Sequence, residues 1–119
     1  MSDSNTESIL MSIKRLLGIT PTDEAFDEEL VMHINGVFMT LHQLGIGPDE
    51  GFSISSYDSY WTDFTDNLKL KDTVRMFVYL KVRMIFDPPT SSAATEAINQ
   101  RMAELEFRLN VQAEGDAES

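Results

Sequence analysis

The sequence predicts an all-α protein, a small bundle of four to five helices with one long ordered loop. Apolar residues recur at helical spacing over most of the chain. Glycine or proline stands where these stretches end, as is typical of helix ends. The 119 residues suffice for one hydrophobic core but not for two. We therefore expect one helical domain over residues 1–119, with disordered tails at residues 1–6 and 113–119.

The first two helices are predicted at about residues 6–17 and 21–44. Gly18 is the expected end of the first helix. Thr20 is a candidate N-cap and Pro21 suits the first helical position, so the second helix is expected to begin there. At about 100° per residue, its apolar side chains fall on one arc: Phe26, Leu30, Ile34, Val37, Phe38, Leu41 and Leu44.

Residues 45–60 are predicted to form a long ordered loop, with a short β hairpin near residues 51–58. The segment GPDEG has the composition of a turn, and the FSI that follows alternates as a short strand does. A short helix is expected near residues 60–66. Aromatic residues in and after the loop argue against disorder: Phe52, Tyr57, Tyr60, Trp61 and Phe64.

Two longer helices complete the prediction, at about residues 69–86 and 90–112. Pro88 ends the first of them, because proline disfavours helical geometry in the residue before it. The last helix has a narrow apolar seam whose spacing is typical of packing against one partner helix: Ala94, Ile98, Met102, Leu105 and Leu109.

The sequence lacks the residues and motifs that most enzymes use for catalysis, or has them too far apart to act together. The chain has no cysteine, which excludes disulfides, thiolate nucleophiles and cysteine-based zinc sites. His33 and His42 are expected on opposite sides of one helix, so they cannot share a metal ion. No glycine loop or serine motif for catalysis is present. We therefore predict a protein that is not an enzyme and that binds neither metal nor cofactor.

The net charge of −11 argues against a protein that binds nucleic acid through its phosphates, since such binding needs clustered Lys and Arg.

No apolar run approaches the ~20 residues needed to span a bilayer. We expect a protein made in the cytoplasm that has no membrane partner.

The long second helix carries apolar residues on two sides. Met32, Gly36 and Met39 lie on the face away from its main apolar arc. Two methionines with a glycine between them could form a close contact for another chain. Alternatively, this helix is central and is covered on both sides within one copy.

Five further residues are candidates for contact with other subunits. Lys81 falls within the apolar arc of its helix, where it either extends its ammonium to water or pairs with an acid. Trp61 is a lid over the core, the interpretation we favour, or a docking residue. Phe52 belongs to the loop, and Phe107 and Val111 point away from the seam of the last helix.

One segment resembles a known family. The run VYLKVRMIFDPPTSS at residues 78–92, followed by AINQRMAELEFRLN, resembles the C-terminal half of small head–tail connector (adaptor) proteins of long-tailed double-stranded DNA bacteriophages. The N-terminal half fits as well, with SIKRLLGI, HINGVFMTLHQLG and GPxxGFSI. The resemblance covers about residues 7–112.

The resemblance implies a structural virion protein at the head–tail junction. Such proteins assemble on the portal vertex as a ring, typically of about twelve copies of themselves. Their partners are the portal protein and a stopper or another neck or tail protein, and DNA passes through the ring without sequence-specific binding. By this analogy, the tail after the last helix is a portal-docking candidate, and the loop at residues 45–60 is a ring or channel element.

The main alternative is a small acidic helical regulator or DNA mimic that binds a basic partner. It would explain the charge of −11 directly. It predicts tight one-to-one binding to a basic protein and no affinity for portal rings.

Overall fold

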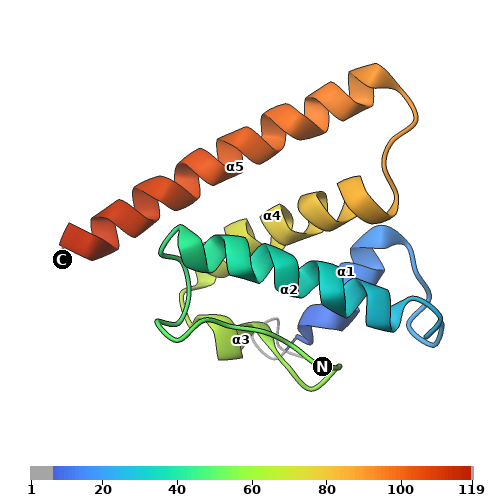
Figure 1. Ribbon diagram of the computed structural model, residues 1–119, viewed down its shortest axis with the longest axis horizontal. Helices are drawn as coiled ribbons and strands as arrows, with labels where there is room; N and C mark the ends of the chain where they lie inside the picture. The colour runs from blue at the N-terminus through green and yellow to red at the C-terminus, as the bar shows by residue number, and fades with distance from the viewer. Residues whose placement is uncertain (1–6, 119) are drawn as a thin grey trace.

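The computed structural model describes residues 7–118, and it arranges them as five helices joined by loops (Figure 1). The helices are α1 (Ile9–Leu17), α2 (Asp27–Gln43), α3 (Trp61–Phe64), α4 (Leu68–Phe86) and α5 (Ser92–Glu118). Helix α4 is central, because α1, α2 and α5 all pack against it. The predicted all-α bundle is confirmed.

The buried residues form one cluster between α1, α2, α4 and the segment around α3. Most of the predicted arc of α2 is buried, and so are Leu105 and Leu109 of the α5 seam. Phe26 is an exception: it is 42% exposed, and its ring packs edge-on against Phe86. Hydrophobic periodicity therefore located the core correctly.

Helix α1 begins and ends as its sequence predicts. The Ser8 side chain caps it by accepting a hydrogen bond from the Met11 backbone N–H. Gly18 ends it in the left-handed region, with φ of 80°, where a residue without Cβ is favoured.

Helix α2 begins at Asp27, so the predicted start at Pro21 is wrong. Residues 20–26 form turns instead. The Pro21 and Asp23 carbonyl oxygens accept hydrogen bonds from the Lys14 ammonium, at 3.2 and 2.8 Å. Because these two carbonyl oxygens bind the buried Lys14 ammonium, the segment follows a non-helical path.

The β hairpin predicted near residues 51–58 is also wrong, since residues 7–118 contain no strand. The Asn35 side chain accepts a hydrogen bond from the Ile54 N–H at 2.7 Å and donates one to the Ile54 carbonyl at 2.9 Å. These backbone groups are the ones that a hairpin partner would use. The loop is ordered by a side chain of α2 instead.

Helix α5 runs to Glu118, beyond the predicted end near Gln112. The sequence predicts a disordered tail from residue 113, whereas the structure continues the helix there. Ala113 packs against the core, and its Cβ lies 3.7 Å from where a Cβ on Gly45 would stand. This contact and the absence of proline favour continuation, because adding a residue to an existing helix is easy. The other predicted tail, at residues 1–6, lies outside the described residues.

Candidate assembly surface

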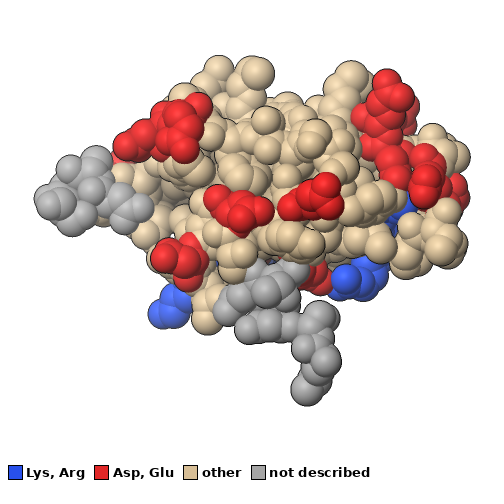
Figure 2. Space-filling model, turned by 90° about the horizontal axis from the view of Figure 1, so that it is seen from below, with Lys and Arg blue, Asp and Glu red and all other residues tan. Residues whose placement is uncertain are grey.

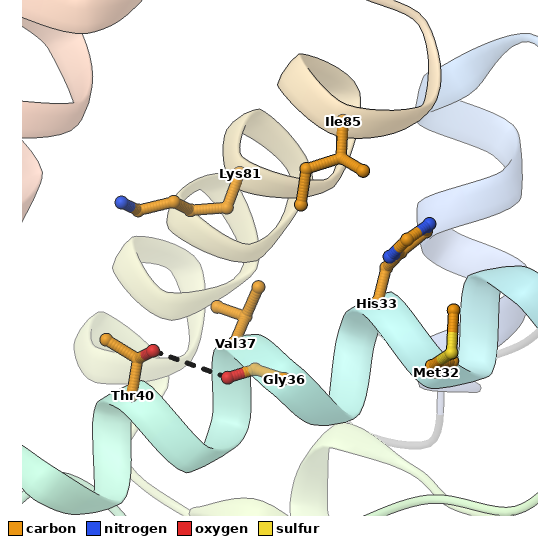
Figure 3. Close-up of a pocket in the computed structure, with 7 residues that line it drawn as sticks. All are labelled: Met32, His33, Gly36, Val37, Thr40, Lys81 and Ile85. Atoms are coloured by element: carbon orange, nitrogen blue, oxygen red, sulfur yellow. Dashed lines mark hydrogen bonds between the residues drawn. The ribbon is translucent and has the colours of Figure 1, made fainter.

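Helices α2 and α4 enclose a shallow groove between them (Figure 3). Its volume is about 230 Å³. The α2 wall is built at spacings of three and four residues, which place side chains on one helical face. The groove is lined by Met32, His33, Gly36, Val37, Thr40, Lys81 and Ile85.

Apolar side chains are exposed in this groove, at Met32 and Ile85, and on the α2 surface near it, at Met39. Met32 is 62% exposed, Met39 is 65% exposed, and Ile85 on α4 is 60% exposed. A Cβ added at Gly36 would have nothing within 4 Å. The alternative in which this face of α2 is covered within one copy is therefore wrong, and contact with another chain stays a prediction.

Lys81 projects into the groove from α4 and is half-buried. Its ammonium lies 5.5 Å from the centre of the Phe77 ring, a cation–π distance. It forms no salt bridge with any acid among the described side chains, those of residues 7–115.

Trp61 and Phe52 are parts of the core more than of the surface. Trp61 is fully buried, and its indole N–H donates to the Ser12 hydroxyl at 2.9 Å. Docking by Trp61 is thus excluded in this fold, and the lid interpretation holds. Phe52 is half-buried, with its ring centre 4.9 Å from that of Phe38 and 5.3 Å from that of Phe64.

Phe107 and Val111 form an exposed apolar strip on α5. Phe107 is 69% exposed and Val111 is 52% exposed. Leu105 and Leu109, on the opposite side of the helix, are buried in the seam against α4. The sequence-based placement of Phe107 and Val111 away from the seam is confirmed.

Sequence reasoning missed a buried polar cluster around Lys14. The Lys14 side chain is 1% exposed, and its ammonium lies 2.8 Å from the Asp27 carboxylate. It also donates to the Tyr57 hydroxyl at 2.8 Å, and Tyr57 in turn donates to Asp27. The cluster ties α1, the start of α2 and the loop together. Its signal in the sequence was the position of Lys14 four residues after Leu10, on the apolar face of α1.

The pKa values of this cluster follow from the balance between burial and charge. Burial acts to lower the pKa of Lys14, but the hydrogen bonds with Asp27 and Tyr57 and the Asp27 charge raise it above its ordinary value. Burial acts to raise the pKa of Asp27, but the Lys14 and Tyr57 hydrogen bonds and the Lys14 charge lower it. The hydrogen bond to Asp27 raises the pKa of Tyr57. The shifts of Lys14 and Asp27 favour their charged forms, and the raised pKa of Tyr57 favours the protonated hydroxyl that donates to Asp27.

The side of the molecule with α3 and the loop is acidic (Figure 2). Residues 45–67 contain five acids and no Lys or Arg. Each of these acids is exposed. The view shows acidic side chains scattered over this face with few basic ones, which is a poor surface for gripping phosphates. The five are Asp49, Glu50, Asp58, Asp63 and Asp66.

Two further features concern metals and membranes. Among the described side chains of residues 7–115, no three His, Asp or Glu side chains are placed to hold a metal ion. No helix of the described chain combines the length and hydrophobicity needed to cross a membrane.

A helical bundle that exposes apolar faces on two of its helices is typical of proteins that contact other proteins. Comparison with protein families makes this specific: the family model described as phage connector protein matches residues 9–116. The chain therefore belongs to the phage connector protein family, and the resemblance noted in the sequence is confirmed.

Family membership assigns the chain a structural role as a phage connector. It implies interaction with portal and neck or tail proteins and a location in the virion. Comparisons with curated proteins and with solved structures found no significant match.

Proposed function

We propose that this protein assembles as a ring on the portal vertex, links the DNA-filled head to the neck and tail, and extends the DNA channel. The family match over residues 9–116 carries the proposal, because it spans nearly all of the described fold. By analogy with such connectors, the ring contains about twelve copies, a closed cyclic assembly.

The exposed surface supports assembly into a ring. A closed ring with head-to-tail contacts needs two different patches on each subunit. The chain has one apolar patch at the α2–α4 groove, around Met32 and Met39, and a second on α5, at Phe107 and Val111. Single exposed apolar residues are common on monomers, but these are grouped on two helical faces.

The acidic character supports a channel through which DNA moves. A ring surrounding DNA must let the polymer slide, and an acidic lumen binds phosphate weakly. We propose that the face with the loop at residues 45–60 lies toward the channel and that the C-terminal end of α5 contacts the portal. In Figure 1 this end of α5 projects beyond the rest of the bundle.

The charge also bears on when the ring forms. Copies that each carry −11 repel one another, so we propose that the isolated protein stays monomeric until the portal arranges its copies. Light scattering of the purified protein at low salt tests this point. A monomer mass is expected, and a stable ring without portal would contradict it.

A binding experiment with isolated portals tests the main proposal. Purified portal rings are incubated with excess protein and then sedimented, and the bound copies are counted by quantitative mass spectrometry. We expect many copies per portal, near one per portal subunit, and no binding to capsid protein alone. The acidic-regulator alternative predicts no portal binding and a one-to-one complex with a basic protein, so that result would overturn the proposal.

A further inference from the structure

The groove between α2 and α4 has the size and lining of a pocket for one aromatic side chain. Its volume of about 230 Å³ exceeds the roughly 150 Å³ cavity that holds a benzene molecule in other proteins. Its floor at Gly36 carries no side chain, and a Cβ there would meet nothing within 4 Å. Met32 and Ile85 line it and are exposed, and the flexible Met32 side chain can adapt to an inserted ring.

The same groove has one positive charge that no described acidic side chain neutralises. Lys81 extends along the groove toward the Thr40 end, away from Met32 (Figure 3). Its contact is with the Phe77 ring, and it makes no salt bridge with a side chain of residues 7–115. An occupant that places an aromatic residue over Gly36 and an acid near Thr40 would therefore match the groove in shape and charge.

The outer face of α5 carries this combination. Phe107 is 69% exposed, and Glu114 lies seven residues later on the same face, about 10 Å along the helix axis. Val111 lies between them and is 52% exposed. Glu114 is exposed and forms no salt bridge with a described residue, unlike Glu104, which pairs with Arg101 and Arg108.

We infer that, in the ring proposed above, α5 of each copy docks in the α2–α4 groove of the next copy. Phe107 inserts over Gly36, and Glu114 pairs with Lys81. This order of contacts makes α5 of the neighbour run in the same direction as α2 and brings Val111 beside Met39. The inference depends on the proposed function, since it names the contact that joins the copies of the ring. The two patches differ, so the contact repeats from copy to copy.

Cross-linking tests the contact and its direction, because the chain has no cysteine of its own. The full-length variant Met39→Cys/Val111→Cys is bound to portal rings and treated with a short bis-maleimide. Both positions are exposed, so the substitutions spare the core. We expect a ladder of covalent dimers, trimers and higher multiples, and only dimers from a mixture of the two single-cysteine variants.

The matched control is Met32→Cys/Val111→Cys. Met32 and Met39 lie on one face of α2 and are similarly exposed, but Met39 lies about 10 Å further along the helix, where the inferred contact places Val111. Loss of the ladder in this control is expected. Adding Gly36→Leu to the first variant fills the groove and should abolish the ladder without lowering Tm, because leucine is a better helix former than glycine.

A charge exchange gives a second measurement. Lys81→Glu should reduce the copies bound per portal, and Lys81→Glu/Glu114→Lys should restore them. Three results would overturn this contact and leave the proposed function intact, provided that wild-type protein still binds portals. They are a ladder from Met32→Cys/Val111→Cys, a ladder that survives Gly36→Leu, and failure of the charge exchange. Failure of the wild-type protein to bind portals would instead overturn the proposed function and the contact with it.

Discussion

Replacing Asp27 with asparagine tests the buried ion pair that joins α1 to α2. The Lys14 side chain is 1% exposed, and its ammonium lies 2.8 Å from the Asp27 carboxylate. Removing one partner of a buried pair costs about 3–5 kcal/mol, because the other charge is left uncompensated. The Asp27 side chain is 19% exposed, and Tyr57 and two carbonyls still contact Lys14. We therefore expect the lower end, about 3 kcal/mol.

Urea unfolding followed by circular dichroism measures this loss. A domain of this kind has a free energy of unfolding of about 5–15 kcal/mol, so a loss of about 3 kcal/mol moves the midpoint clearly. Glu104→Gln is the matched control, since it breaks two exposed ion pairs, each worth less than about 1 kcal/mol. Lys14→Met/Asp27→Asn should recover stability relative to Asp27→Asn, because no buried charge remains. Equal costs for Asp27→Asn and Glu104→Gln would refute the reasoning.

The same pair predicts a pH dependence. The pKa of Asp27 is lowered below its ordinary value of 3.8, so its stabilisation is present above that value and is lost as the pH falls through the folded-state pKa. The pKa of Lys14 is raised above 10.5, so its contribution is intact below 10.5 and is lost only at higher pH. The difference in stability between wild type and Asp27→Asn should be constant from about pH 5 to 9 and should narrow below pH 4. Urea titrations across this range measure it, and a difference that widens in acid would contradict the assignment.

Three further substitutions test local features by thermal unfolding. Gly36→Ala should raise Tm by a few degrees, since alanine gains about 1 kcal/mol in a helix and meets no neighbour here; a lower Tm would contradict the open groove floor. Asn35→Ala should cost about 1–3 kcal/mol, because it leaves both backbone groups of Ile54 without their partner. Gly47→Ala should cost about 2–4 kcal/mol: its φ is 98°, and the new Cβ would lie 2.6 Å from the Phe64 ring. Unchanged Tm in either of these two variants would show that the loop is not held as described.

The helices and the core were predictable because they depend on local pattern. Periodicity places Ile34 and Val37 inside α2, and the seam places Leu105 and Leu109 inside α5. The same pattern, read on the opposite face, identified Phe107 as exposed. These assignments need only the helical repeat and no knowledge of distant neighbours.

The errors occurred where side chains from distant segments decide the backbone path. Thr20 and Pro21 have the local chemistry of a helix start, but Lys14 binds carbonyls of the same segment and the helix begins later. The FSI segment has strand-like alternation, but Asn35 takes the backbone groups of Ile54. Contacts of this kind, formed across long stretches of sequence, carry no local pattern.

Electron microscopy of phage particles made without this protein tests the central claim most directly. If the protein joins head to tail, a deletion lysate should contain DNA-packed heads and free tails that remain separate, and adding purified protein should restore joined particles. The matched addition of a Gly36→Leu variant should restore fewer, since it fills the groove. Normal tailed particles in the absence of the protein would contradict the account.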